Sequence, residues 1–403
     1  MNEASAAPMA TVTLKAKRDQ SIRRKHPWVF SGGIKRIEGN PQSGDWVQVC
    51  ANKGAILGWG HYSPNASIAV RMLSFDEQLP DDAWWQHKIA QAVEVRKALN
   101  LVGNEDQNAC RIVHAEGDGM PGLIADLYGT VLVVQCHTPG MHRTLPTLIE
   151  AFKLALGDGL SGIYDKSAKT LAKNGGEAST DGWVWGSAPE QPVATELGHR
   201  FLIDWERGQK TGFFLDQRVN RNLLGTYSAG KKVLNVFSYT GGFSIYAMKA
   251  GATEVHSLDS SRRALDVCED NVRLNGLDTD KHRTIQEDAL EFLKGDTLGD
   301  YDIVVLDPPA FAKRASARHA AVQGYKRINL RALEGMKPGS LLFTFSCSQA
   351  VDDALFSNTV IAAAIQAQRT VRILHRLHQP PDHPVSAFHP EGSYLKGLVL
   401  RVD

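Results

Sequence analysis

The C-terminal half of the chain alternates between short apolar runs and longer amphipathic segments. The β-prone apolar runs lie at residues 232–237, 254–259, 282–288, 301–307 and 340–346. Segments with the helical spacing of apolar residues lie near 242–250, 261–275, 289–294, 318–335 and 352–367. Strand–helix alternation of this kind predicts a parallel sheet whose crossover connections are right-handed.

The pattern changes near the C-terminus. Two β-prone runs, at 370–379 and 394–402, are separated by a Pro- and Gly-rich segment without helical spacing. This predicts an antiparallel hairpin at the edge of the sheet. Seven strands with a terminal hairpin are typical of the methyltransferase variant of the doubly wound α/β fold, so we expect residues 191–403 to form such a domain.

The N-terminal part of the chain begins with short β-prone runs. Glycine-punctuated β-prone runs at 28–37, 45–51, 54–63 and 67–73 predict a small β-rich barrel or sandwich over residues 11–75. Residues 76–190 begin with a helical pattern and continue, within 111–136, with two strand signals around a Gly- and Pro-rich turn. We therefore expect a central α+β domain there. Gly, Ser and Pro at 173–192 predict a loop or a domain boundary.

Composition narrows the class of protein. The chain has 403 residues, and no stretch approaches the roughly 18 apolar residues of a membrane span. Residues 1–10 are small and polar, which favours a disordered tail over a targeting signal. The five cysteines are odd in number and form no CxxC pair, which argues against a disulfide framework and a metal site and favours the cytoplasm.

Charge is distributed unevenly along the chain. Residues 1–75 contain ten Lys and Arg against four Asp and Glu, a balance of +6, whereas the whole chain carries +1. Arg23, Arg24 and Lys25 lie close to Trp28, a mixture suited to phosphate contact and base stacking. A polyanion such as RNA is one interpretation. A solubilising surface beside a core tryptophan is the other, and charge alone leaves both open.

The residues that follow each strand carry the chemistry, because ligands of open α/β sheets bind at the carboxyl ends of the strands. After the first strand come Phe237, Tyr239, Gly241 and Gly242, and the glycines allow the backbone to turn tightly beside a ligand. The turn lacks the GxGxxG pattern of pyrophosphate-binding sites. This favours a nucleoside without a pyrophosphate, of which S-adenosylmethionine is the common example, over NAD.

Two carboxylates extend this predicted cofactor site. Asp259 ends the second strand, 17 residues after Gly242, about the spacing at which a carboxylate reaches a ribose diol. Asp288 ends the third strand, where it can accept a hydrogen bond from an adenine amine. Each Asp taken singly is more typical of a helix N-cap than of a ligand contact. The ordered set of glycines and carboxylates is what favours a ligand.

The fourth and fifth strands end in Asp307-Pro308-Pro309 and in Cys347, within "FTFSCSQ". The prolines stop the strand, and Asp307 can bind the exocyclic amine of cytosine or guide a proton at the adjacent ring nitrogen. A thiolate that adds to carbon 6 of a pyrimidine makes carbon 5 nucleophilic enough to take a methyl group. Cys347 lies at a strand end between polar neighbours, which suits this role.

The other cysteines fit a structural role better. Free cysteine is among the most buried residue types, and Cys110, Cys136 and Cys268 lie in apolar surroundings in the sequence. Lys313 and Arg314, in the segment after the fourth strand, are candidates both for RNA contact and for lowering the pKa of the Cys347 thiol.

Together these motifs resemble the bacterial 23S ribosomal RNA cytosine-5 methyltransferases with an N-terminal PUA domain. "RRKHPWVFSG" and "GDWVQV" resemble the PUA segment of that family. The segments that resemble its catalytic domain are "GQKTGFFLDQR", "NVFSYTGGFS", "DPPAFAK", "FSCS" and "HPEGSYLKGLVLRV". The resemblance implies a PUA RNA-binding domain over 11–75, a central α+β domain over 76–190, and a seven-stranded Rossmann-like class I methyltransferase domain over 191–403.

The resemblance also implies the partners and the site. S-adenosylmethionine would be the methyl donor, with Gln217, Arg218 and Asp307 near it, and Cys347 would be the nucleophile. The partner would be 23S ribosomal RNA; the oligomeric state stays open, with a homodimer among the options. Many related enzymes have a second cysteine where this chain has Ala310.

Two alternative functions remain at this stage. Relatives with similar "QKTG" and "FSYTG" segments methylate guanine at nitrogen 7, a reaction that needs no cysteine. A non-catalytic RNA-binding factor in ribosome assembly is the other alternative. Cys347 favours cytosine over guanine, and the intact set of site residues favours an enzyme.

Overall fold

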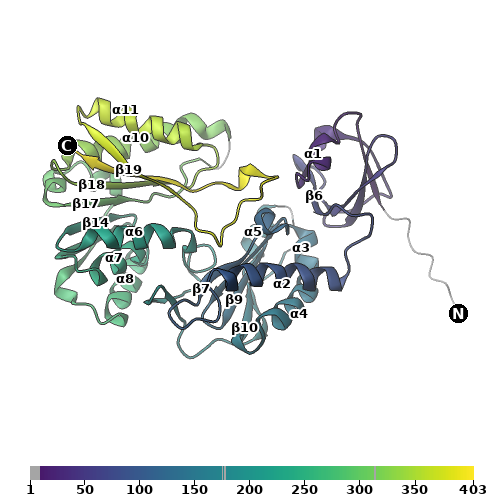
Figure 1. The fold of residues 1–403 in the computed structure, drawn as a ribbon, viewed down its shortest axis with the longest axis horizontal. Helices are drawn as coiled ribbons and strands as arrows, with labels where there is room; N and C mark the ends of the chain where they lie inside the picture. The colour runs from purple at the N-terminus through teal and green to yellow at the C-terminus, as the bar shows by residue number, and fades with distance from the viewer. Residues whose placement is uncertain (1–9, 175, 177, 313–314) are drawn as a thin grey trace. The chain divides into compact units, whose positions relative to one another are not determined.

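The computed structural model describes residues 10–174, 176, 178–312 and 315–403 (Figure 1). The chain divides into two compact units. The first contains the residues up to Thr195 together with Ile203–Phe213 and Pro381–Gly392. The second contains Glu196–Leu202, Phe214–Pro380 and Ser393–Asp403. Lys313, Arg314 and residues 1–9 of the expected tail lie outside the described residues.

The first unit begins with a six-stranded sheet in the order β2-β6-β5-β4-β1-β3. Its elements are β1 (Thr11–Leu14), α1 (Gln20–Arg23), β2 (Trp28–Phe30), β3 (Ile34–Glu38), β4 (Trp46–Cys50), β5 (Ile56–Tyr62) and β6 (Ile68–Ser74). Alternate apolar residues of these strands are buried in one cluster, among them Val12, Val47, Val49, Val70 and Met72. This period of two is what a half-buried strand requires.

A second, five-stranded sheet in the same unit has the order β11-β10-β9-β8-β7. Its strands are β7 (Ala109–His114), β8 (Leu123–Tyr128), β9 (Val131–Cys136), β10 (Gly162–Asp165) and β11 (Gly182–Gly186). The accompanying helices are α2 (Asp82–Ala98), α3 (Pro139–Arg143), α4 (Leu145–Leu156) and α5 (Ala168–Lys173). A two-stranded sheet of β12 (Val193–Glu196) and β13 (His199–Leu202) follows in the chain.

Two details of this sheet correct the sequence-based expectation. The region 111–136 forms three strands rather than two, because Gly129 adopts a left-handed φ of 60° and turns the chain between β8 and β9. The segment expected to be a loop or boundary contains β11, whose Trp183 and Trp185 pair with Tyr164 and Ile163 of β10. Aromatic residues suit a strand, and here they outweigh the surrounding Gly and Ser.

The second unit contains a seven-stranded sheet in the order β16-β15-β14-β17-β18-β20-β19. Its strands are β14 (Lys232–Val236), β15 (Glu254–Asp259), β16 (His282–Gln286), β17 (Ile303–Leu306), β18 (Leu341–Ser346), β19 (Val371–His378) and β20 (Lys396–Val402). The pairs among β14 to β18 are parallel, and β20 is antiparallel to both β18 and β19. The expected methyltransferase fold with its terminal hairpin is confirmed.

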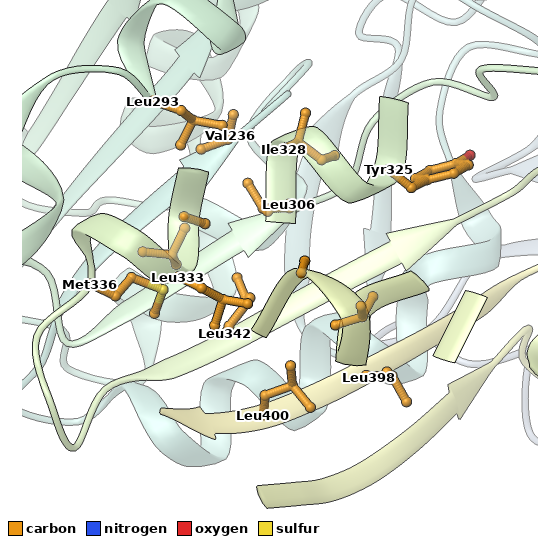
Figure 2. Packing of buried hydrophobic residues seen from close by; sticks show 14 of the residues in the cluster. Val236, Leu293, Leu306, Tyr325, Ile328, Leu333, Met336, Leu342, Leu398 and Leu400 are labelled. Atoms are coloured by element: carbon orange, nitrogen blue, oxygen red, sulfur yellow. The ribbon is translucent and has the colours of Figure 1, made fainter. Parts of the chain in front are cut away.

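Helices cover both faces of this sheet. They are α6 (Arg218–Ser228), α7 (Gly242–Lys249), α8 (Arg262–Leu274), α9 (Ala289–Phe292), α10 (Arg318–Gly335) and α11 (Asp353–Gln366). Figure 1 shows α10 and α11 on one face and α6, α7 and α8 on the other. Buried residues of α10, such as Ile328 and Leu333, pack against Leu306, Leu342 and the strands beside them (Figure 2). Burial of both faces explains the continuous apolar runs of the central strands.

Among the described residues, none of the helices has the length and apolar character that a membrane crossing requires.

Candidate active site

The loop after β14 has an unusual backbone. Phe237, Tyr239 and Gly241 adopt left-handed φ angles of 62°, 48° and 81°. For the two aromatic residues this conformation costs of the order of 1–3 kcal/mol each and persists only where neighbouring groups enforce it. Such strain gathers at ligand-binding turns. Nothing in the residue types of Phe237 and Tyr239 could have predicted it.

Neighbouring side chains hold this loop in place. The backbone N–H of Tyr239 donates to Asp259 Oδ2 at 2.9 Å, and Asn271 Nδ2 donates to the Thr240 carbonyl oxygen at 2.9 Å. The Tyr239 ring meets the edge of Phe214, with ring centroids 5.3 Å apart. Side chains from the neighbouring strand and from α8 therefore fix the turn in advance of any ligand.

The two glycines of this loop are needed for packing. A Cβ at Gly241 would overlap the Cys268 sulfur, and one at Gly242 would lie 3.1 Å from Cδ of Arg221. Gly241 also begins α7 as its N-cap, with a φ that L side chains rarely adopt. The glycines thus let α8 and α6 approach the loop closely.

Buried polar atoms around the loop remain unpaired within the described residues. They are Asn235 Oδ1, Ser238 Oγ and Thr240 Oγ1. An unsatisfied buried polar atom costs about 1–3 kcal/mol, so three of them in one short segment suggest groups that a ligand completes. A nucleoside with its hydroxyls and amines fits such a donor and acceptor set.

Asp259 and Asp288 both use carboxylate oxygens on backbone groups. Asp259 accepts from Tyr239 through Oδ2 and from the N–H of Ser261 through Oδ1, each at 2.9 Å. Asp288 is the N-cap of α9 and accepts from two of its backbone N–H groups, at 2.9 and 3.2 Å. The N-cap role considered for Asp288 is therefore present. An ionised carboxylate has about four acceptor sites, so both residues keep capacity for a ligand hydroxyl or amine.

Asp307 follows β17 and is half-buried. Burial raises its pKa from 3.8 to about 7, the nearby Asp216 raises it further, and a hydrogen bond from Gln217 and the charge of Arg221 oppose the shift. Asn220 Nδ2 in turn donates to Gln217 Oε1 at 2.6 Å. Gln217, expected near the cofactor, thus contacts Asp307 directly.

Arg218, expected beside Gln217, is buried in the first turn of α6. Three residues later, Arg221 forms a buried two-pronged ion pair with Glu196, at 2.9 and 2.8 Å, and donates to the Phe214 carbonyl oxygen at 2.9 Å. The Tyr246 hydroxyl also donates to Glu196, at 3.0 Å. This network fixes α6 and the segment that carries Gln217.

Cys347 lies one residue beyond β18 and is half-buried, whereas the other four cysteines are buried. Burial raises the pKa of the Cys268 thiol to about 12 and raises those of Cys50 and Cys136 as well. A thiol with a raised pKa is a poor nucleophile at neutral pH. Cys347 is thus the most accessible thiol of the protein.

The loops that bear Asp307 and Cys347 are joined. Ser348 Oγ donates to the Ala312 carbonyl oxygen at 2.8 Å, which links the loop after β17 to the loop after β18. Tyr325 of α10 interacts with groups of both: burial raises its pKa to about 12, and its environment includes Ser346, Cys347 and Asp307. Figure 2 shows its hydroxyl directed away from the other labelled residues of the core.

Lys396 is a residue of this site that the strand-end pattern of the sequence does not indicate. It is the first residue of β20 and pairs with Ser346, because β20 runs antiparallel to β18. Its Nζ donates to the carbonyl oxygens of Ser348 and Val351, at 2.7 and 2.6 Å. The signal that could have found it is the motif "HPEGSYLKGLVLRV", in which a lysine directly precedes the apolar run of the strand.

The basic cluster of the first unit is exposed. Arg23, Arg24 and Lys25 all have exposed side chains, and Arg23 pairs with Asp19 at 2.7 Å. Trp28 is half-buried, and its indole N–H donates to Glu116 at 2.9 Å. A cavity of about 370 Å³ adjoins this cluster, lined by Leu14, Arg18, Ser21, Ile22, Trp28, Val29, Phe30, Gly32 and Gly33.

The seven-stranded fold and a strained, partly unsatisfied loop after its first strand define the class of protein as a methyltransferase that uses a nucleoside cofactor. The family model described as S-adenosylmethionine-dependent methyltransferase matches residues 122–401, and that of a PUA-like domain matches residues 12–75. The chain belongs to the S-adenosylmethionine-dependent methyltransferases. Both the family and the PUA-like domain expected from the motifs are confirmed.

Curated relatives match along nearly the whole chain. The ribosomal RNA large subunit methyltransferase I of Shewanella denitrificans is 41% identical over 397 residues, 97% of this chain and 99% of that protein. Its counterpart in Aeromonas hydrophila is 39% identical over 400 residues, with the same coverage. A methyltransferase structure from Streptococcus mutans has a TM-score of 0.83 at 22% identity, covers 98% of this chain and 100% of that chain, and shows the shared fold.

Proposed function

We propose that this protein transfers a methyl group from S-adenosylmethionine to carbon 5 of a cytosine in 23S ribosomal RNA, with Cys347 as the nucleophile. The observation that carries the proposal is the half-buried Cys347 at the end of β18, joined through Ser348 to the loop of Asp307. The names of the relatives, ribosomal RNA large subunit methyltransferase I, support the substrate class. The reaction belongs in the cytoplasm, where ribosomes are assembled.

The cofactor contacts in this proposal come from the carboxyl ends of β14, β15 and β16. Asp259 accepts hydrogen bonds from the ribose hydroxyls, and Asp288 accepts one from the adenine amine. Phe237, Tyr239, Gly241 and Gly242 would hold the cofactor from the loop after β14. Gln217 and Arg218 would contact it from the start of α6. The bound cofactor supplies an electrophilic methyl group on its sulfonium sulfur.

Asp307 prepares the cytosine for attack. Because burial raises its pKa to about 7, a neutral carboxyl is accessible there near neutral pH. A neutral carboxyl donates its proton toward ring nitrogen 3 and accepts from the exocyclic amine through its other oxygen. A partial positive charge on the ring makes carbon 6 more electrophilic, which is what addition of a thiolate needs.

The covalent steps balance as follows. The Cys347 thiolate forms a bond to carbon 6, and nitrogen 3 receives the proton from Asp307. Carbon 5 then uses its enamine electron pair to take the methyl group, whose bonding pair stays on the donor sulfur. A base removes the proton from carbon 5, the electron pair re-forms the double bond between carbons 5 and 6, and the thiolate leaves. Asp307 recovers its proton from nitrogen 3.

RNA binding falls to the first unit in this proposal. Arg23, Arg24 and Lys25 neutralise phosphates, and the cavity beside Trp28 and Phe30 accepts a base or a backbone turn. Lys313 and Arg314, outside the described residues, stay candidates for contact with the target strand.

RNA that carries 5-fluorocytidine tests the mechanism. Fluorine at carbon 5 cannot leave as a proton, so the enzyme should remain covalently attached and migrate as a denaturation-resistant complex. Cys347→Ala should form no complex and should lose methylation. A guanine nitrogen-7 enzyme would form no complex and would keep full activity in Cys347→Ala. Nucleoside mass spectrometry of 23S RNA from cells lacking the protein identifies the missing base.

A further inference from the structure

The lysine at the start of β20 has an unusual environment. Lys396 is only 4% exposed, and lysine is almost never buried without a partner. Two of its three donors bond the carbonyl oxygens of Ser348 and Val351, the residues that follow Cys347. The backbone turn that presents Cys347 is therefore held from inside by one buried side chain.

The charge of Lys396 faces acidic groups. Burial lowers its pKa, and Asp353, Cys347 and Asp352 each act in the opposite direction. Cys347 thus lies within electrostatic reach of the ammonium group. Because Lys396 is buried, salt and water screen this attraction less than they would screen the same pair in solution.

We propose that Lys396 is a positioning residue for the methyl transfer: it fixes the loop that carries Cys347, and its positive charge stabilises the thiolate. The proposal rests on the proposed function of Cys347 as the nucleophile. Lys396 would thus lower the pKa of the Cys347 thiol, a role for which the sequence offers Lys313 and Arg314.

The other groups around the thiol act against the thiolate. Tyr325 on α10 is neutral, with its pKa raised by burial, while Asp307 after β17 adds negative charge when ionised. Asp352 and Asp353 at the start of α11 are also acidic. Arg221 is a second cation in this set of interactions, but it acts on Asp307, whereas the cation that acts together with Cys347 is Lys396. Its removal should therefore raise the pKa of Cys347.

The rate at which iodoacetamide alkylates Cys347 measures this pKa directly. The reaction is followed by peptide mass spectrometry across pH in the full-length protein, without RNA or cofactor. In Lys396→Met, we expect the midpoint to rise by about one unit, which makes alkylation at pH 7 about tenfold slower. Lys396→Gln keeps a hydrogen-bond donor without the charge and should show a similar shift. Lys396→Arg should retain the wild-type midpoint.

Two controls separate charge from loop geometry. Lys337→Met removes a lysine that pairs with Asp302, just before the amino end of β17. Cys347 lies at the carboxyl ends of the strands, so this variant should not change the pH midpoint of Cys347 alkylation. Ser348→Ala disturbs the loop without removing the charge and should also leave the midpoint unchanged. Thermal unfolding of each variant identifies any that are misfolded.

An unchanged midpoint in both Lys396→Met and Lys396→Gln, with folding intact, overturns the proposal. So does an equal rise in Ser348→Ala. If Lys396→Met fails to fold, the comparison of Lys396→Gln with Lys396→Arg decides. The alkylation test is independent of the methylation test. Full methylation by Cys347→Ala would contradict the proposed function, whereas the alkylation profiles would still measure the effect of the Lys396 charge on the thiol.

Discussion

Asp302 and Asp307 lie at the two ends of β17, and their pKa values are shifted in opposite directions. For Asp302, burial acts to raise the pKa, but hydrogen bonds from the Lys232 N–H at 2.8 Å and from Lys337 at 2.9 Å outweigh it, so the value is lowered. For Asp307, burial raises the pKa to about 7. The amino end of β17 therefore stabilises the ionised form of Asp302, and its carboxyl end destabilises the ionised form of Asp307.

The first prediction concerns how stability depends on pH. Because the folded-state pKa of Asp307 lies above the unfolded value of 3.8, folded protein holds a proton that unfolded protein has lost. Its contribution to stability therefore falls as pH rises from about 4 to about 7. Asp307→Asn should be more stable than wild type at pH 8, with the difference vanishing near pH 4. Thermal unfolding across pH measures this.

Asp302→Asn provides the contrasting control. Its lowered pKa means that the carboxylate contributes stability above the unfolded pKa, and that this contribution is lost as pH falls through the folded value. The variant should be less stable than wild type at pH 8, and the deficit should shrink in acid. If both variants show the same pH trend, the opposite shifts are wrong.

The second prediction concerns the link between the loop of Asp307 and the loop of Cys347. Ser348→Ala removes the bond to Ala312 and leaves a buried carbonyl oxygen unpaired, which costs about 1–3 kcal/mol. Loss of alignment between Cys347 and Asp307 should lower kcat by about tenfold or more, with little change in cofactor affinity. Ser340→Ala removes a similar bond, to the Lys337 carbonyl at 2.6 Å, before the start of β18. That control should keep wild-type kcat in a steady-state methylation assay.

The third prediction concerns the buried pair of Arg221 and Glu196. Their side chains are 3% and 0% exposed, so Arg221→Met leaves a buried carboxylate without its cation and should cost about 3–5 kcal/mol. The exposed pairs of Arg262 with Asp266 and Glu269 are the control, because solvent screens them and Arg262→Met should change stability far less than Arg221→Met. Urea denaturation of both variants gives the comparison. Similar losses in the two would contradict the burial argument.

The strand ends could be predicted from sequence because each apolar run stops at a polar residue. Asp307 follows β17 and Cys347 follows β18, and parallel strands bring such residues to one edge. Lys396 could not be predicted in the same way. Its position depends on the register of β20 against β18, which pairs residues 50 positions apart. A pattern of apolar residues predicts a strand and leaves its register open.

Residue types alone also fail to predict some backbone conformations. Phe237 and Tyr239 are typical strand residues, and their left-handed φ angles arise because Asp259, Asn271 and the packing around Gly241 fix the turn. The strand β11 lies in a segment for which the many Gly and Ser residues predict a loop, although Trp183 and Trp185 favour a strand. At Phe237 and Tyr239 tertiary contacts outweigh local preference, whereas in β11 the strand preference of the two tryptophans outweighs that of the Gly and Ser beside them.

The last prediction separates the two acidic residues of the cofactor site. In Asp288→Asn the side-chain carbonyl still caps α9, so stability should be unchanged, and any loss of S-adenosylmethionine affinity reports a ligand contact. Asp259→Asn keeps one acceptor for the loop but loses the charge that we propose receives the ribose hydroxyls, so its Kd for the cofactor should rise by about tenfold or more. Isothermal titration with S-adenosylhomocysteine measures both. If Asp288→Asn binds as tightly as wild type, its carboxylate is a helix cap alone, because the cap is the one interaction that the amide preserves.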